Sequence, residues 1–403
     1  MELSELQTTL LRILSCALAG KTTDLDGEAV DWTALYHEAL TQTVFAQVYY
    51  AVEASIPEKQ SALWQKTYAK IIANNMRVTY EHAELHSLMT EKRIPYVSFK
   101  GCASADRYAV PLLRTMGDVD LLVHEEDDAR AAEALQSAGF QPPADQGHSS
   151  HQAYHQGKST WELHWRINGI PEGFAGDQTR AFLRDIIETA VSMETEEGTV
   201  LIPDSFHHGI VLLVHMGKHL INTGIGLRHL CDWAAFVSSM SSDEFIRLFD
   251  PALKQCGLWR FAQLMTQLSI RYLGISEQPW AMEELNDALL LEMIKDIFSS
   301  GNFGHKDRQR INQAKLLTNK EKGTVDDTGF LRQLVSTMNV KARIGMPVCR
   351  DVPVLLPIGW LYVGGRHLLR IGQGRRPEID IMETIRGAEE RQKIYREFYL
   401  YEK

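Results

Sequence analysis

The stretch Thr115–Val123, "TMGDVDLLV", places two aspartates around a single valine and then continues as an apolar run. The apolar run predicts a buried β-strand. Because successive side chains of a strand point to opposite faces, Asp118 and Asp120 are expected on one face and Val119 and Leu121 on the other. Two adjacent carboxylates at the mouth of a buried strand repel each other unless a cation lies between them. The stretch therefore predicts a strand and raises the hypothesis of a cation site at its start.

Length, charge and cysteine content narrow the class of protein. A chain of 403 residues is too long for one ordinary hydrophobic core and predicts two or three domains. Its apolar content of 44% and charged content of 23% are typical of a soluble globular protein and exclude a disordered one. The formal charge of −10 argues against a broad basic surface for duplex DNA or RNA. The five cysteines are scattered without a C-x-x-C pair, which fits a reducing cytoplasm and offers no structural zinc site.

Targeting signals and membrane spans are not expected. The N-terminal segment carries acids early, unlike the basic start of a signal peptide. The longest apolar run, from Val352, is too short to span a bilayer and contains Pro357. We therefore expect a cytoplasmic protein without a transmembrane segment.

Hydrophobic periodicity divides the chain into five segments. Residues 1–90 predict helices, 91–202 predict strands with interspersed helices, and 203–300 predict helices again. Residues 301–330 are polar and predict a long loop or linker. Residues 331–403 predict a mixed tail that ends in a charged helix.

The middle segment carries the sheet. A β-rich run from Ile94 is followed by a glycine turn and a helix, and a second helix after the Asp-x-Asp strand should end with Gly139 just beyond its C-terminus. Next, "SSHQAYHQGKSTWELHWRI" predicts a hairpin that turns at Gly157 and Lys158. That register pairs His155 with Thr160, Ala153 with Glu162, and His151 with His164, and it places Thr160, Glu162, His164 and Arg166 on one polar face.

This order of strand, glycine turn, helix, Asp-x-Asp strand and later acid suits nucleotidyl transfer. The reaction uses two divalent ions, roughly 3.5–4 Å apart, to neutralise a triphosphate and stabilise both the attacking and the leaving oxygens. Mg²⁺ prefers oxygen ligands, and Asp118, Asp120 and Glu162 would supply three carboxylates. Small residues after Lys100 would let backbone N–H groups approach phosphate at a helix start.

The same residues resemble a known family. The pattern "FKGCASADRY…LLRTMGDVDLLV…ALQSAGF…WELHWRI" is similar to the poorly characterised bacterial nucleotidyltransferase-like family within the DNA polymerase beta-type nucleotidyltransferase superfamily. The similarity covers residues 90–235, because "HMGKHLINTGIGLRHLCDWA" resembles the helical part of that family. The resemblance implies an α+β fold with a mixed β-sheet core, flanking helices and mostly helical terminal regions. It makes residues 91–202 the catalytic core and 203–300 a helical domain.

The resemblance also assigns roles. It implies two Mg²⁺ ions held by Asp118, Asp120 and Glu162. The implied reaction is the transfer of an NMP from an NTP, with ATP as the default, and the release of pyrophosphate. The nucleotide-binding residues would be Lys100, Gly101, Cys102, Ser104 and Arg114. Lys100 and Arg114 could equally be surface charges. The chain departs from the wider superfamily in its phosphate turn, where Cys102 replaces the usual glycine or serine and the spacing to Asp118 is longer.

Further polar residues have several interpretations. The substrate-pocket candidates are His164, His215, Lys218, His219 and Arg228. Four histidines, His148, His151, His155 and His164, suggest zinc, but hairpin structure or acceptor binding suits a hard-cation site better. His215 and His219 lack the glutamate of an H-E-x-x-H motif. Arg228 and Asp232, four residues apart, predict an intrahelical ion pair.

The acceptor is left open by the sequence. The acidity of the chain and the family resemblance favour a non-nucleic-acid acceptor, such as a small molecule, a sugar, a peptide or a protein. The alternatives are a catalytically silent nucleotide- or partner-binding protein, and a nucleotidyltransferase toxin that modifies tRNA. The basic segment "GGRHLLRIGQGRR" of the tail has two interpretations: a solvated helix, or a segment that contacts a membrane surface or an acceptor.

Overall fold

A four-stranded mixed sheet holds the predicted site residues. This computed structural model describes residues 2–142, 150–282, 287–304 and 306, parts of 335–372, and residue 400. The order of the strands in the sheet is β1-β2-β4-β3. Its strands are β1 (Tyr96–Ser98), β2 (Val119–Val123), β3 (His151–Gln156) and β4 (Ser159–His164). Strand β1 is antiparallel to β2, β2 is parallel to β4, and β3 and β4 form a hairpin. The mixed sheet with flanking helices confirms the predicted α+β class.

The hairpin register is the one that the sequence predicts. His155 pairs with Thr160, Ala153 with Glu162, and His151 with His164. The turn residue Gly157 has φ of +59°, a left-handed conformation in which a side chain would be strained.

Both faces of the sheet pack against helices. Val119, Leu121 and Val123 of β2 join a core with α4 (Glu58–Lys92) and α6 (Asp128–Ser137). Leu122 points the other way, into the larger core of the helical layer. The alternation predicted from "DVDLLV" is therefore observed, and it turns Asp120 towards the helical layer. Gly139 follows α6 with φ of +94°, as predicted for its C-terminal end.

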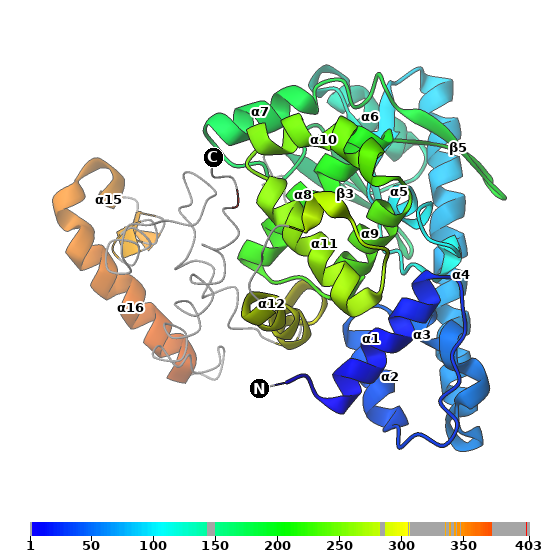
Figure 1. Ribbon diagram of the computed structural model, residues 1–403. Helices are drawn as coiled ribbons and strands as arrows, with labels where there is room; N and C mark the ends of the chain where they lie inside the picture. Colours follow the sequence, from blue (N-terminus) through cyan, green and yellow to red (C-terminus); the bar gives the residue numbers. More distant parts are fainter. Residues whose placement is uncertain are drawn as a thin grey trace.

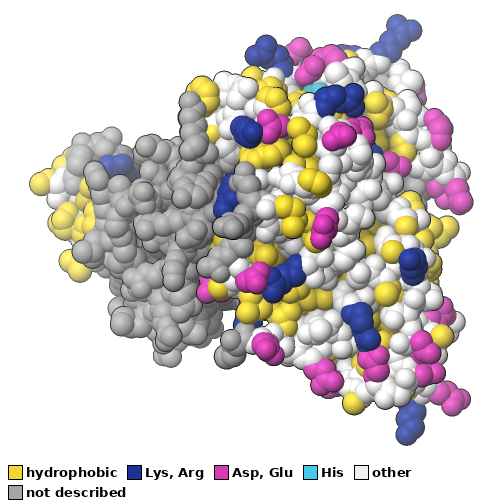
Figure 2. Space-filling view, viewed as in Figure 1, with side chains coloured by type: hydrophobic (Ala, Val, Ile, Leu, Met, Phe, Trp, Pro, Cys, Tyr) yellow, Lys and Arg dark blue, Asp and Glu magenta, His cyan; other side chains and the backbone are white. Residues whose placement is uncertain are grey.

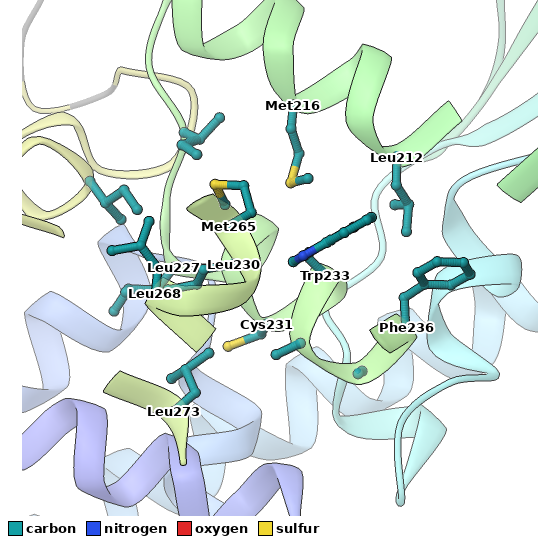
Figure 3. Close-up of a cluster of buried hydrophobic side chains, with 14 of the residues drawn as sticks. Leu212, Met216, Leu227, Leu230, Cys231, Trp233, Phe236, Met265, Leu268 and Leu273 are labelled. Atoms are coloured by element: carbon teal, nitrogen blue, oxygen red, sulfur yellow. The ribbon is translucent and has the colours of Figure 1, made fainter. Parts of the chain in front are cut away.

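The helical layer combines the N-terminal helices with the helices of residues 205–300. Five of its helices are α8 (Ser205–Asn222), α9 (Leu227–Ser238), α10 (Ser242–Gln255), α11 (Trp259–Leu273) and α12 (Asp287–Ser300). These helices share one hydrophobic core with α1 (Glu5–Leu18), α2 (Trp32–Thr41) and α3 (Phe45–Val52). In Figure 1, α8 to α11 cluster beside the sheet, and α4 runs as one long helix along the edge of the molecule. Figure 3 shows side chains of α8, α9 and α11 converging around Trp233. This core fixes α8 and α9 over the polar face of the sheet.

A second hairpin, β5 (Val191–Thr195) and β6 (Gly198–Ile202), was not predicted. Strand β5 is largely exposed and carries no apolar run, whereas β6 ends in the apolar run Val200–Ile202, which the sequence analysis did not single out. The remaining helices are α5 (Gly101–Ala105), α7 (Phe174–Phe182), α15 (Val348–Asp351) and α16 (Leu356–Gly372). Short 3₁₀ helices lie at Glu53–Ser55, Pro111–Leu113, Glu125–Asp127, Pro279–Ala281, Asn302–Gly304 and Pro353–Leu355.

Some predicted segments fall outside the described residues, namely most of the 301–330 linker, the charged C-terminal helix and His148. Within the described part of the chain, none of the helices combines the length and apolar character needed to cross a bilayer.

Candidate active site

A cavity of about 370 Å³ lies between the polar face of the sheet and helices α5, α8 and α9. Its size suits a small-molecule site. Every residue that the sequence analysis assigns to the site lines this cavity except Cys102: Lys100, Gly101, Ser104, Arg114, Asp118, Asp120, Glu162, His164, His215, Lys218, His219 and Arg228.

The carboxylates meet because β2 and β4 are parallel neighbours. Asp120 pairs with Glu162 across the ladder, so the two side chains lie next to each other on the same face. Asp118 precedes β2 by one residue and also opens into the cavity. Asp120 is only 3% exposed, which makes its charge costly unless it is neutralised.

The three acids titrate differently. Burial, followed by the charges of Asp120 and Glu162, raises the pKa of Asp118 to about 6. The pKa of Asp120 is lowered despite its burial, because Lys100 and His164 stabilise the charged form. The pKa of Glu162 is lowered chiefly by its hydrogen bond with His164. Asp118 is thus the carboxylate whose charge is least compensated by the protein.

Lys100 serves as the counter-ion of Asp120. Its Nζ lies 2.7 Å from Asp120 Oδ1 and 5.0 Å from the centre of the Phe99 ring. Lys100 also has φ of +66°, a conformation that side chains rarely adopt. Such backbone strain persists only where the surroundings over-determine it. The fold therefore directs this ammonium into the acid cluster.

His164 bridges two of the acids. Its Nε2 lies 3.0 Å from Asp120 Oδ1 and 3.3 Å from Glu162 Oε2, and its ring stacks on His151. Burial lowers its pKa, but the hydrogen bonds to the two acids outweigh this and raise it. His164, a predicted substrate-pocket residue, is 2% exposed and lines the cavity, and its ring is also engaged with the carboxylates. It positions them as a hydrogen-bond donor.

Hydrogen bonds with α4 and an ion pair with α9 hold the loop before β2 in place. Asn75 of α4 donates to the carbonyls of Leu112 and Arg114 and accepts from the Met116 N–H. Arg114, in turn, forms a bidentate pair with Asp232 of α9, with both N–O distances 2.8 Å. These contacts fix the chain immediately before Asp118.

The Arg114 pair revises one expectation. Asp232 was predicted to pair with Arg228 on its own helix, but its bidentate partner is Arg114, and Tyr108 also donates to it at 2.7 Å. Arg114 was predicted to bind nucleotide. It lines the cavity, but two of its donors are committed to Asp232, so it connects the loop to α9.

The α8 and α9 side of the cavity is cationic and aromatic. Burial, followed by the charge of Lys100, lowers the pKa of Lys218. Among the described residues, no acidic side chain forms an ion pair with Lys218. Burial and nearby cations also lower the pKa of the three imidazoles of His215, His219 and His229, so they are neutral at pH 7. The cavity therefore has an acidic wall on the sheet and a positive wall on the helices.

The glycine turn is tight, and Cys102 lies outside the cavity. A Cβ on Gly101 would lie 3.1 Å from Nε2 of the buried His82, so a larger residue would force His82 to move. The Cys102 side chain belongs instead to the sheet core and borders a separate cavity, because Gly101 and Cys102 face different sides of α5. Ser104 reaches the active-site cavity, and its hydroxyl is buried without a hydrogen-bond partner among the described residues.

The donor set fits a divalent cation. Asp120, Glu162 and His164 offer ligand atoms within 4.8 Å of one another, the one such group of three found among the described residues. An imidazole that ligates a metal usually donates its other N–H to an acceptor, but Nδ1 of His164 has no partner there. Carboxylate oxygens, including those of Asp118, are therefore the better ligands, and they are the type that Mg²⁺ prefers.

Several site residues were missed from the sequence. His82, Asn75 and Tyr108 lie far from the Asp-x-Asp motif in the chain and have no local pattern that distinguishes them from core residues. His229 follows Arg228 and could have been included by helical spacing from Asp232.

Comparison with known proteins agrees with this geometry. A family model described as an uncharacterised nucleotidyltransferase matches residues 28–274. No curated protein matches the chain. The match covers more than half of the 403 residues and includes the whole acid cluster, Lys100 and the cavity-lining parts of α8 and α9. The chain therefore belongs to this family of nucleotidyltransferases.

Proposed function

We propose that the protein is a Mg²⁺-dependent enzyme that moves an NMP from an NTP to a hydroxyl or phosphate of a non-nucleic-acid acceptor, with release of pyrophosphate. One observation carries the proposal. Asp118, Asp120 and Glu162 converge on one cavity, and burial, together with the charges of Asp120 and Glu162, raises the pKa of Asp118 to about 6. Three clustered carboxylates repel one another, so they would destabilise a protein that binds neither metal nor nucleotide.

Asp118, Asp120 and Glu162 would hold the metal. Two bound Mg²⁺ ions would neutralise the triphosphate and stabilise the attacking and leaving oxygens. Lys100 keeps Asp120 ionised, and His164 holds Asp120 and Glu162 side by side through its Nε2. These two residues thereby maintain the carboxylates in their ligating form.

The triphosphate is assigned to the helical wall. From the sequence, Lys100 was expected to contact it, yet the Lys100 ammonium lies 2.7 Å from Asp120. Lys218 forms no ion pair with an acidic side chain of the described chain, and it lines the same cavity as Lys100 and the acid cluster. We therefore assign Lys218 to the phosphates, with Arg228, Gly101 and Ser104, which line the same cavity, as further contacts.

The test is direct transfer. The purified protein would be incubated with each radiolabelled NTP, ATP first, and MgCl₂, and pyrophosphate release and label transfer would be measured. Wild type should release pyrophosphate, and Asp118→Asn and Asp120→Asn should not. A pool of candidate acceptors, together with total tRNA, would identify the acceptor class.

The competing functions give different results in the same assay. A catalytically silent binding protein would bind NTP without pyrophosphate release from wild type. A tRNA-modifying toxin would move label into the RNA pool. Either result would contradict the proposal.

A further inference from the structure

The positive wall of the cavity differs from the molecular surface. On the described part of the face that Figure 2 shows, Lys and Arg side chains lie apart from one another and among acidic ones, so water and neighbouring acids weaken their attraction for an anion. Lys218 instead lines the cavity and forms no ion pair with an acidic side chain of the described chain. Because a lysine stem is flexible, an ammonium that is already in place loses less conformational entropy when it binds a phosphate.

The stem of Lys218 packs against a glycine of the loop that follows β4. A Cβ on Gly169 would lie 2.8 Å from Lys218 Cβ and 2.9 Å from Lys218 Cδ. Carbon atoms in contact are usually about 3.5–4.0 Å apart, so the Lys218 stem occupies the space that a side chain at residue 169 would need. Gly169 also has φ of +96°, a conformation that side chains rarely adopt. The space and the backbone therefore both require glycine at this position.

The residue before this glycine is connected to the acidic wall of the cavity. Asn168 lines the cavity, and its Nδ2 donates to Nδ1 of His151 at 2.9 Å. The His151 ring stacks on His164, with the ring centres 4.8 Å apart. His164 in turn bridges two of the three carboxylates. Two successive residues of one loop thus contact the two opposite walls, Asn168 through stacked imidazoles and Gly169 directly.

The loop itself is anchored on both sides of these two residues. Ile167 and Ile170 pack against the core of the helical layer. The carbonyl of Pro171 accepts a hydrogen bond from Arg180 Nη1 of α7 at 3.1 Å. The loop also continues directly from β4, the strand that carries Glu162. Its path from the acidic wall to the positive wall is therefore fixed.

We propose that Gly169 is a positioning residue for the nucleotide: the anchored loop places the Lys218 stem through Gly169, so that the ammonium is already in place where the phosphates bind. This inference rests on the proposed function, because it takes Lys218 as a phosphate contact. Gly169 does not touch the nucleotide in this arrangement. It acts through the position of Lys218, and any side chain added at residue 169 displaces that stem.

The test is a double-mutant cycle on the full chain, with a non-hydrolysable ATP analogue and Mn²⁺ in titration calorimetry. Gly169→Ala should weaken the analogue by about tenfold, the loss expected for Lys218→Met itself. Binding of Mn²⁺ alone should be unchanged, because the metal binds at the acidic wall. In the Lys218→Met background, Gly169→Ala should change the affinity for the analogue by less than about twofold, since the ammonium is already gone.

Gly173 provides the matched control. It lies on the same loop with φ of +93°, but a Cβ there would meet nothing within 4 Å. Gly173→Ala therefore introduces similar backbone strain without contact with Lys218. Both alanine variants should lower the unfolding temperature, and only Gly169→Ala should weaken the analogue.

A second variant covers the case in which Gly169→Ala does not fold. Ile170→Ala loosens the loop from outside the cavity lining. It should weaken the analogue by about threefold, and by less in the Lys218→Met background, because a less restrained Lys218 loses more conformational entropy on binding.

Three results would overturn the inference: wild-type affinity for the analogue in Gly169→Ala, an equal loss in Gly173→Ala, or a loss of the same size in the Lys218→Met background. A wild type that does not bind the analogue would contradict the proposed function itself and the inference with it.

Discussion

Asp118 connects the site to the pH dependence of stability. Its pKa is raised to about 6 in the folded chain, above the ordinary aspartate value, so the folded state binds its proton more tightly than the unfolded state does. Stability from this group should therefore fall as pH rises from about 4 to about 6 and stay lower above that range. Without metal, Asp118→Asn should be more stable than wild type at pH 7 by about 1–3 kcal/mol.

The measurement is the unfolding temperature in chelator between pH 4 and pH 8. The difference between wild type and Asp118→Asn should be absent near pH 4 and reach its full size above pH 6. Asp118→Asn should also lose nucleotidyl transfer. A variant with the pH profile of wild type would show that Asp118 is not the strained carboxylate.

Lys100 and Lys218 should separate metal binding from nucleotide binding. Lys218→Met should weaken a non-hydrolysable ATP analogue about tenfold or more in titration calorimetry and leave Mn²⁺ binding unchanged. Lys100→Met should instead change the affinity for Mn²⁺ and leave the affinity for the ATP analogue unchanged. It removes the ammonium that lies 2.7 Å from Asp120, so Mn²⁺ should bind more tightly to a more negative cluster.

Arg343→Met provides the control, because it removes a cation outside the cavity lining. Loss of nucleotide affinity in Lys100→Met but not in Lys218→Met would return the triphosphate to the glycine turn.

The limits of sequence reasoning are visible in these residues. Asp118, Asp120 and Glu162 could be grouped in advance, because strand alternation and hairpin register fix which side chains share a face. The ion-pair partner of Lys100 could not be predicted from the sequence. Lys100 has φ of +66° at the start of α5, and that conformation has no signature in the sequence of a non-glycine residue.

At the scale of elements, the Arg114–Asp232 pair joins the loop before β2 to α9. Both residues are 5% exposed, so removing one partner leaves an uncompensated buried charge. Arg114→Met or Asp232→Asn should cost about 3–5 kcal/mol of unfolding free energy, measured in denaturant. The double variant Arg114→Met with Asp232→Leu should recover part of this loss.

The exposed pair Arg166–Glu125 is the matched control. Its side chains are 63% and 60% exposed, so Glu125→Gln should cost no more than about 1 kcal/mol. Similar costs for the buried and the exposed pair would show that the buried pair does not hold the loop.

The elements also differ in how well the sequence predicted them. The β3–β4 hairpin was predicted to the residue, since Gly157 sets the turn and alternation sets the faces. The β5–β6 hairpin was missed because β5 is largely exposed and carries no apolar run, although β6 ends in Val200, Leu201 and Ile202. The prediction that Cys102 lies in the nucleotide site was wrong because α5 has five residues, too few for periodicity to show which of its faces is buried.

At the scale of the whole molecule, the cavity joins two layers with separate cores. The carboxylates come from the sheet, and Lys218 and Arg228 come from the helical layer. A ligand that contacts both layers stabilises both, because anything that binds the folded state alone raises its stability by mass action. Metal alone should engage the acidic wall, whereas metal with nucleotide should engage both walls.

Unfolding temperatures should therefore rise in two steps. Mn²⁺ alone should give a first increment, and Mn²⁺ with a non-hydrolysable ATP analogue should give a larger one; at 100 times the dissociation constant a ligand adds about 2.7 kcal/mol. Asp120→Asn should lose both increments, since nucleotide binding depends on the acidic wall. Lys218→Met should keep the first and lose most of the second, because only its contact with the helical layer is removed. If Lys218→Met keeps both increments, the nucleotide lies on the sheet alone, and the positive wall of α8 and α9 must serve the acceptor.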